Sequence, residues 1–293
     1  MLFKIKRRIR LIVQLCFTAL SNGYWKGFAE GKIYTGFGKA LCVPGLNCYS
    51  CPGALGSCPI GALQATLGSR NYKFAFYVFG FLMAVGALAG RFVCGWLCPF
   101  GLFQELLYKI PFFRKIKKLP GDRILKWLKY VILAVFVILL PLFAVDIVGQ
   151  GQPWFCKYIC PAGTAEAGVP LVILNESLRA VIGWLYAWKL AILIVLVFLS
   201  LLVYRPFCRY LCPLGAVYGL CNPVAFFRYK VDPQKCTKCG ACQKACPIDI
   251  KTYVKPNSLE CIRCGACKKT CPHGAIQNNF TKKKGTECKN NDR

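Results

Sequence analysis

The chain has 293 residues, 56% of them hydrophobic, and its mean hydropathy is +0.45, which is too apolar for a soluble domain of ordinary composition. The formal net charge of +28 could indicate nucleic-acid binding, but Lys and Arg cluster beside apolar segments. We therefore expect the basic residues to set membrane orientation and to contact lipid head groups, and we expect no nucleic-acid partner.

Four apolar segments predict a membrane part built of helices. They comprise residues 11–25, 74–90, 130–145 and 180–204, and a membrane span needs about 20 mostly apolar residues. The first segment is short and carries Gln14, Thr18 and Asn22, so alone it could be a re-entrant or interfacial helix. Basic residues before it resemble the start of a signal peptide, but no A-x-A-like cleavage site follows, and we expect the segment to be retained.

The distribution of charge predicts the orientation of these segments. Residues before 11, from 91 to 126, and after 204 are strongly basic, whereas residues 149–179 are nearly balanced. The positive-inside rule then places both termini and residues 91–126 in the cytoplasm of a multi-pass plasma-membrane protein. The loop of residues 21–73 would face outward, although its five basic residues against one Glu fit that side poorly.

Cysteine pairs follow or flank the apolar segments. The same C-x3-C-P-x-G element occurs at Cys94 and Cys98, and again at Cys208 and Cys212. Two cysteines at positions i and i+4 lie on one face of a helical turn, and the following Pro ends or redirects the helix. We expect these four cysteines to share one [4Fe–4S] cluster at the cytoplasmic ends of two helices. The alternative is a pair of reduced thiols in a redox or packing motif.

Six further cysteines are predicted to face the outer side, namely Cys42, Cys48, Cys51, Cys58, Cys156 and Cys160. They suffice for one more cluster, formed either by the first loop alone or by two of its cysteines together with Cys156 and Cys160. Disulfides in that compartment are the alternative. Three more cysteines (Cys16, Cys221 and Cys288) fit no set.

The most specific pattern is C-x2-C-x2-C-x3-C-P, which occurs twice near the C-terminus. In two-cluster ferredoxins the fourth Cys of each run binds the other cluster. We assign one [4Fe–4S] cluster to Cys236, Cys239, Cys242 and Cys271, and the second to Cys261, Cys264, Cys267 and Cys246. A pair of zinc sites is the alternative, but zinc sites rarely need the third Cys or the Cys-Pro.

The predicted fold class is therefore a membrane α-helical part with about four transmembrane helices and a small α+β ferredoxin domain with two [4Fe–4S] clusters. We predict residues 1–230 as the transmembrane region, residues 231–276 as the ferredoxin domain and residues 277–293 as a basic polar tail. The spacing of the cysteines indicates metal ligands rather than a disulfide framework. Two clusters are expected in the ferredoxin domain, and up to four in the whole chain.

The combination of C-x3-C-P elements with a C-terminal two-cluster ferredoxin resembles the membrane polyferredoxins of the NapH and NosR kind. The resemblance covers residues 91–99 and 205–276. It implies a quinol-side electron donor to a periplasmic reductase, with Cys94/Cys98 and Cys208/Cys212 in the cytoplasm. The chain departs from that family in its cysteine-rich loop of residues 42–58 and its third element at Cys156/Cys160, and it lacks the flavin-binding domain of the NosR kind.

The sequence thus predicts an electron-transfer subunit of an oxidoreductase system rather than a stand-alone enzyme. Its donor would be a ferredoxin-like or flavin-bearing protein, or a quinol, and its acceptor a membrane or extracytoplasmic redox protein. For a quinone site, Lys189, Asp146 and Glu105 are the ionisable candidates. We interpret the single histidine, His273, as a neighbour of a cluster. The alternative function is a redox-sensing or metal-handling membrane regulator without sustained electron flux.

Overall fold

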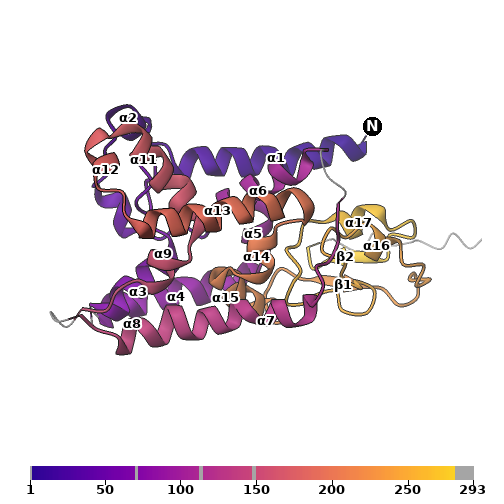
Figure 1. Ribbon diagram of the computed structural model, residues 1–293. Helices are drawn as coiled ribbons and strands as arrows, with labels where there is room; N and C mark the ends of the chain where they lie inside the picture. Colours follow the sequence, from indigo (N-terminus) through magenta and orange to yellow (C-terminus); the bar gives the residue numbers. More distant parts are fainter. Residues whose placement is uncertain (1, 70–71, 112–114, 147–149, 281–293) are drawn as a thin grey trace, which may run out of the picture.

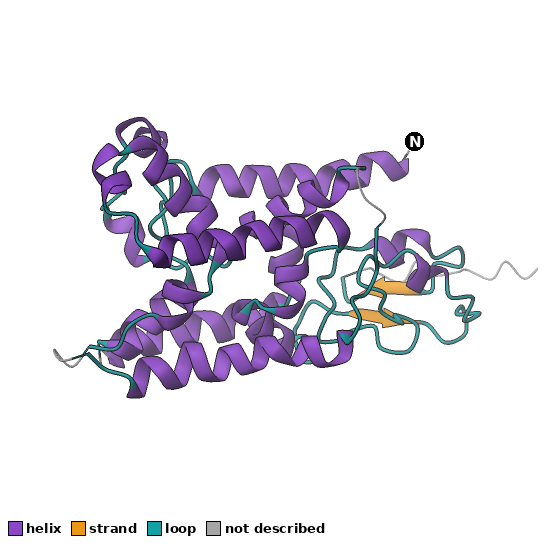
Figure 2. Cartoon of the chain, in the orientation of Figure 1, coloured by secondary structure: helices purple, strands orange, loops and turns teal. Residues whose placement is uncertain are grey.

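The computed structural model describes residues 2–69, 72–111, 115–146 and 150–280. Cys288 and most of the predicted basic tail lie outside the described residues. Figure 1 shows long helices lying lengthwise, with a separate lobe at one end beside the N-terminus. Figure 2 shows that the strands occur in this lobe, while helices and loops make up the remainder.

All four predicted apolar segments fall on long helices: α1 (Leu2–Ser21), α4 (Tyr72–Ala89), the continuous run of α7 (Asp122–Ile132), η2 (Leu133–Leu139) and α8 (Leu140–Phe143), and α13 (Trp184–Leu202). Within the described residues, Asp122–Phe143 and Trp184–Leu202 are long and apolar enough to cross a membrane. The apolar stretches of α1 and α4, Ile9–Ser21 and Phe76–Ala89, are shorter. Length and composition thus support two of the four predicted spans.

A further apolar helix, Pro161–Leu174, is one that we do not predict from the sequence. It consists of α10 (Pro161–Gly163), the π-helical turn η3 (Thr164–Gly168) and α11 (Val169–Leu174). Like η2, which comes just before Pro141, η3 comes just before a proline, Pro170. A proline lacks the N–H that would bond back along the helix, and a π turn is one way to absorb that defect.

Successive long helices run in opposite directions, which determines where the loops lie. The segment after α4 and everything after α13 return to the end that holds the N-terminus, whereas α2 (Trp25–Glu30), α11 and α12 (Glu176–Ala180) lie at the opposite end (Figure 1). The short helices in between are η1 (Phe37–Ala40), α3 (Pro59–Gly68), α5 (Phe92–Trp96), α6 (Pro99–Lys109), α9 (Trp154–Tyr158), α14 (Pro206–Tyr210) and α15 (Pro213–Cys221).

The C-terminal lobe is a small α+β unit. Its strands β1 (Tyr229–Val231) and β2 (Ile276–Asn278) pair antiparallel, with Lys230 opposite Gln277, and its helices are α16 (Ala241–Lys244) and α17 (Ala266–Thr270). Gly240 and Gly265 precede these helices with φ of 74° and 77°, a conformation that favours glycine. Each strand extends two residues beyond the predicted domain bounds of 231 and 276.

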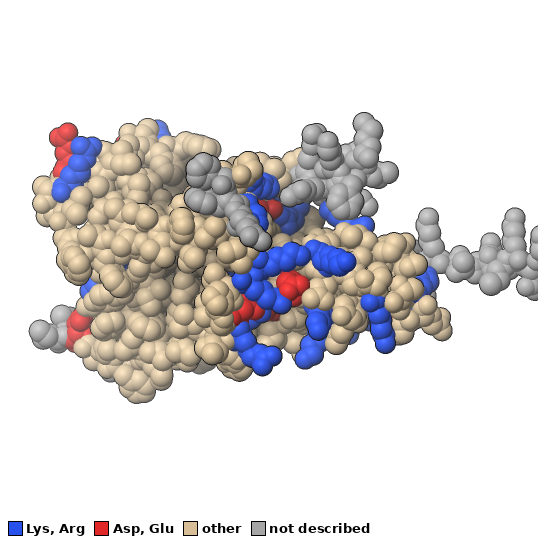
Figure 3. Space-filling model, turned by 45° about the vertical axis from the view of Figure 1, so that its right-hand side comes forward, with Lys and Arg blue, Asp and Glu red and all other residues tan. Residues whose placement is uncertain are grey.

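The surface separates into an apolar body and a basic lobe. Large apolar side chains are exposed along the long helices: Trp184 is 83% exposed, Phe143 77% and Ile194 61%. Such broad exposure is characteristic of a surface covered by lipid. On the face shown in Figure 3, Lys and Arg gather on the lobe and at its junction with the helices, and the body is largely uncharged.

Candidate iron–sulfur sites

The lobe brings the predicted ferredoxin cysteines together in two groups of four. Cys236, Cys239, Cys242 and Cys271 line one small cavity, and Cys239 is exposed. We call this group the exposed site. Its cavity also contacts His273, the single histidine, as predicted.

The second group of ferredoxin cysteines faces the helical part. Cys246, Cys261, Cys264 and Cys267 line another cavity together with Ile262, and we call this group the docked site. Burial raises the pKa of Cys261 and of Cys267 to about 12. Each group therefore combines three cysteines of one run with the fourth of the other, which is the exchange that the spacing predicts.

A third group lies where the two C-x3-C-P elements meet. It consists of four cysteines whose thiols interact electrostatically, and none of them is more than 6% exposed: Cys94, Cys98, Cys208 and Cys212. We call this group the near site. The local fold follows from the sequence: each Cys-Pro starts a helix, because Pro suits the first helical position, and the Cys before it caps that helix. The sulfurs of Cys98 and Cys212 accept the backbone N–H of the glycines three residues later, at 3.4 and 3.3 Å.

Two buried arginines connect the halves of the near site. Arg91 Nη2 donates to the carbonyl of Cys208 at 2.7 Å, and Arg205 Nη1 donates to the carbonyl of Cys94. Both arginines are 1% exposed and come three residues before a cysteine of the site. Each arginine thus contacts the opposite element, and their positive charges lie beside the thiols.

A fourth group lies deeper among the helices and unites the first loop with the third C-x3-C-P element. It consists of Cys48, Cys58, Cys156 and Cys160, whose thiols interact electrostatically. We call it the far site. Burial raises the pKa of Cys58 and of Cys160 to about 12. Of the two combinations that the sequence leaves open, the structure favours two cysteines of the loop with Cys156 and Cys160.

The two other loop cysteines lie beside the far site rather than in it. Cys42 is held by a parallel bridge to Ser57, and burial raises its pKa to about 11. Cys51 lies close enough to Cys48 for the two thiols to interact electrostatically. The twenty cysteines of the described residues are all free thiols in this structure.

The loop that carries Cys48 passes between the helices instead of remaining at the outer end. Leu46 and Asn47 are 2% and 0% exposed. The backbone of Leu46 lies beside the thiol of Cys98, and the backbone of Asn47 lies beside the thiol of Cys58. Consecutive residues therefore link the near site to the far site. Four of the six cysteines predicted to face outward are buried, and Cys48 and Cys156 are partly buried.

The ionisable residues around the far site differ from those of the near site. Glu166 Oε2 accepts the N–H of Cys48 at 2.8 Å, and burial raises the pKa of Glu166 to about 7. Lys189 Nζ donates to the carbonyl of Cys156 at 3.2 Å. Asp146, in contrast, accepts hydrogen bonds from Gln152 near the surface. Of the residues that we considered for quinone chemistry, Lys189 thus belongs to the far site.

The donor sets fit iron–sulfur clusters better than single metal ions. Among residues 2–69, 72–111, 115–146 and 150–280, no three His, Cys, Asp or Glu side chains converge closely enough to hold one metal ion. A zinc ion would need four ligands at about 2.0–2.3 Å. The exposed and docked sites each have four cysteines around one cavity, and the raised pKa of the buried thiols means that their thiolate forms need the positive charge of bound iron.

The docked site packs directly on the near site. Gly95 lies so close to the backbone of Ile262 that a Cβ would collide with its carbonyl oxygen, and Trp96 Nε1 donates to the carbonyl of Arg263 at 3.1 Å. Glu260 accepts from Arg91 at 2.8 Å and from Lys129 at 2.5 Å. The lobe is therefore fixed to the helices by buried polar contacts beside both sites.

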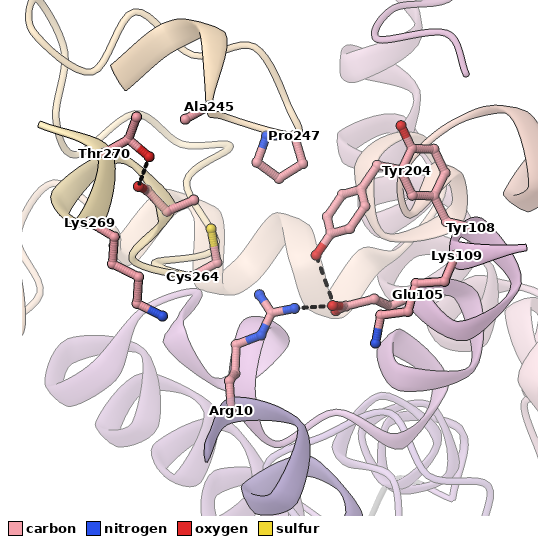
Figure 4. Close-up of a pocket in the computed structure, with 11 residues that line it drawn as sticks. Arg10, Glu105, Tyr108, Lys109, Tyr204, Ala245, Pro247, Cys264, Lys269 and Thr270 are labelled. Carbon is pink, nitrogen blue, oxygen red and sulfur yellow. Dashed lines mark hydrogen bonds and ion pairs between the residues drawn. The ribbon is translucent and has the colours of Figure 1, made fainter. Parts of the chain in front are cut away.

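A cavity of about 310 Å³ opens at the same junction (Figure 4). Arg10 and Glu105 form an ion pair across it, Tyr204 donates to Glu105 at 3.1 Å, and Cys264 of the docked site lines the opposite wall. Burial alone would raise the pKa of Glu105, but Arg205 and Arg10 outweigh it and lower that pKa. The cavity thus combines aromatic walls, paired charges and direct access to a ferredoxin cysteine.

Comparisons with known proteins find two kinds of 4Fe-4S binding domain in the chain. A 4Fe-4S binding domain matches residues 73–120, 130–169 and 186–230, and a second 4Fe-4S binding domain matches residues 229–252 and 254–277. An uncharacterized protein of Methanocaldococcus jannaschii is 33% identical over 203 residues, which are 67% of each chain. The chain belongs to the membrane polyferredoxins of the NapH and NosR kind.

Two relatives represent that family by name. The ferredoxin-type protein NapH of Haemophilus influenzae is 26% identical over 186 residues, which cover 62% of this chain and 57% of NapH. The regulatory protein NosR of Pseudomonas aeruginosa is 30% identical over 188 residues, 59% of this chain and 22% of NosR. No solved structure matches the chain. This polyferredoxin is therefore an iron–sulfur electron-transfer protein of the membrane that binds [4Fe–4S] clusters.

Sequence reasoning missed two glutamines that contact the helical sites. Gln64 Nε2 donates to Cys156 Sγ, and Gln104 Nε2 donates to Cys208 Sγ, both at 3.3 Å. A signal was available: C-P-x-G-x-x-Q begins at Cys58 and again at Cys98. This repeat also makes Cys58 the start of a fourth C-P-x-G element.

Proposed function

We propose that this polyferredoxin conducts electrons between its basic lobe and the interior of the membrane through four [4Fe–4S] sites. The order would be the exposed, docked, near and far sites. A [4Fe–4S] cluster bound by four cysteine thiolates supplies one-electron redox chemistry. The observation that carries the proposal is that each group of cysteines contacts the next through a few buried residues.

The contacts support this order at each step. The exposed and docked sites share the two cysteine runs of the lobe, since each run gives one cysteine to the other site. Gly95, between two cysteines of the near site, packs on Ile262 between two cysteines of the docked site. Leu46 and Asn47 then connect the near site to the far site. The cysteines thus form an uninterrupted series.

The lobe also offers an entry or exit point for a soluble redox partner. Cys239 is exposed, and Lys238 and Lys235 line the same cavity. Basic residues of the lobe and junction form much of the charged surface in Figure 3. Such a surface attracts an acidic partner by electrostatic steering, which increases the association rate and falls with ionic strength. We propose an acidic one-electron carrier at this face, with the lobe in the cytoplasm and four helices spanning the membrane.

The experiment that tests the conduit is the iron and acid-labile sulfide content of the anaerobically purified chain. Four clusters give ~16 irons per chain, and we expect Cys156→Ser or Cys58→Ser to remove about four of them. Cys42→Ser and Cys51→Ser are matched controls in the same loop and should keep the full content. Eight irons in the unsubstituted chain would confine the clusters to the lobe and refute the series. Equal losses in the controls would refute the ligand set of the far site.

The junction cavity favours a second candidate function, the binding of a quinone. Glu105, which we selected from the sequence, lies in this cavity beside Tyr108 and Tyr204, and Cys264 is on its wall. A quinone ring there would lie beside the docked site, and Glu105 and Tyr204 offer polar groups to its oxygens. Organic extraction of the purified protein should then yield quinone, and Tyr204→Phe should weaken its retention. An extract free of quinone from membranes that contain it would refute this candidate.

A further inference from the structure

Two buried glutamines occupy equivalent places at the near and far sites. Gln104 lies on α6 six residues after Cys98, and Gln64 lies on α3 six residues after Cys58. Both side chains are in residues with 0% exposure. A buried amide is costly unless its donors and acceptor are paired, so the partners of each amide indicate why a glutamine is there.

The hydrogen bonds of the two glutamines are the same. Gln104 Nε2 donates to the carbonyl of Phe100 at 3.3 Å and to Cys208 Sγ at 3.3 Å, and its Oε1 accepts the N–H of Phe207 at 3.1 Å. Gln64 Nε2 donates to the carbonyl of Ile60 at 3.2 Å and to Cys156 Sγ at 3.3 Å. Its Oε1 accepts the N–H of Phe155 at 2.9 Å.

The backbone determines the orientation of each amide. The N–H of Phe207 can only donate, so it requires the amide oxygen, and the amide nitrogen must then face the sulfur of Cys208. The same holds for Phe155 and Cys156. The glutamine therefore holds the loop before the C-x3-C-P element and gives an N–H to the first cysteine of that element in one arrangement.

At the near site the helix caps supply a backbone donor to Cys98 and Cys212, which receive the N–H of a glycine three residues later. Cys58 and Cys160 hold the equivalent N-cap positions at the far site, but their sulfurs accept no such hydrogen bond. Cys208 and Cys156 lie inside short helices and receive the glutamine instead. An N–H donated to a cysteine sulfur favours the more negative, reduced state of a bound cluster and therefore raises its reduction potential.

We propose that Gln104 and Gln64 are positioning residues that raise the reduction potentials of the near and far clusters, respectively. This inference rests on the proposed function, because it requires that both sites hold clusters. It goes further by assigning to each site one residue, outside the cysteines, that acts on the thiolate. It also predicts independence: each glutamine should affect its own site and leave the other unchanged.

The test is a redox titration followed by EPR on the anaerobic, full-length chain with Gln104→Met or Gln64→Met. Methionine has a similar length but no donor. We expect each variant to shift one signal to a more negative potential, by about 59 mV if the equilibrium constant for one-electron reduction changes about tenfold. Gln14→Met is the matched control, because Gln14 is equally buried in α1 and its amide has no partner; it should shift no signal.

Iron analysis separates the possible failures. Fewer than ~16 irons in the unsubstituted chain would refute the proposed function before any variant is compared. Full iron in the Met variants with unchanged potentials would overturn the role of the glutamines. If a Met variant loses iron, Gln104→Glu and Gln64→Glu keep the acceptor for the phenylalanine N–H. Restored iron with a lowered reduction potential in the Glu variants would support the proposal. If the Glu variants also lose iron, the glutamines only support the loop, and the proposal is overturned.

Discussion

Removing the charge of Glu260 should loosen the attachment of the lobe. The carboxylate contacts Arg91 and Lys129 at 2.8 and 2.5 Å, and the two cationic side chains are 1% and 0% exposed. Each attraction amounts to about 6 kcal/mol at an effective dielectric constant of about 20. After the cost of desolvation is included, losing one partner of a buried pair destabilises a protein by about 3–5 kcal/mol. Glu260→Gln should therefore lower the melting temperature by roughly 10 °C.

The assay is thermal unfolding of the cluster-loaded protein in detergent, with Glu30→Gln as the control. Glu30 pairs with Lys32 at 3.8 Å, and both side chains are largely exposed, so this change should cost less than about 0.5 kcal/mol. If Glu260→Gln and Glu30→Gln both had the melting temperature of the unsubstituted protein, the reasoning about the buried carboxylate would be refuted.

The pH dependence of this difference follows from the pKa of Glu260. Burial alone would raise that pKa, but Arg91 and Lys129 outweigh it and lower the pKa below its ordinary value of 4.5. A carboxyl with a lowered pKa contributes stability that is fully present above its unfolded value and is lost as the pH falls through its folded value. The deficit of Glu260→Gln should thus be constant from about pH 5.5 to 7 and should narrow only in stronger acid.

Further experiments test the docking of the lobe on the helices, the cysteines that lie in no group of four, and the basic face. Gly95→Ala should disturb the docking of the lobe, because a Cβ there would collide with Ile262. Gly80→Ala is the control, because a Cβ on Gly80 meets nothing within 4 Å. Limited proteolysis of the lobe should be faster in Gly95→Ala and unchanged in Gly80→Ala. Cys16→Ser and Cys221→Ser should keep the full iron content, since neither residue lies in a group of four, and a loss of about four irons in either would contradict the four groups. Reduction by an acidic electron carrier should slow as salt increases, and a rate independent of ionic strength would argue against the basic face.

The cysteine grouping of the lobe could be predicted because the relevant spacing is local. Three cysteines within seven residues must share one loop, and the exchange of the fourth follows from the repeat of the run. The far site could not be chosen in this way. Six cysteines were available, and the choice depends on where the loop of residues 42–58 enters between the helices, which in turn depends on contacts such as that of Cys48 with Glu166, 118 residues away.

The distribution of charge predicted the structure less reliably than the spacing of the cysteines. Arg91 and Arg205 contributed to the basic regions that predict orientation, yet both are 1% exposed and contact the carbonyls of near-site cysteines. Lys129, at the start of a predicted span, is likewise fully buried, and it pairs with Glu260. Composition counts each positive charge alike, whereas the fold uses some of them in its interior. The sequence shows that Pro141 and Pro170 would disturb a helix, but it does not show that a π turn would form before each of them.

The near and far sites share their construction but not their electrostatics. Each has a Cys-Pro helix that carries a glutamine and a second Cys-Pro element to which that glutamine bonds, so the chain contains the same structural unit twice. The near site adds the guanidinium groups of Arg91 and Arg205, while the far site has Lys189 together with the buried carboxyl of Glu166. Positive charge favours the more negative, reduced state of a bound cluster. A repeated unit with unequal buried charge therefore provides two sites of the same type whose potentials differ because of their surroundings.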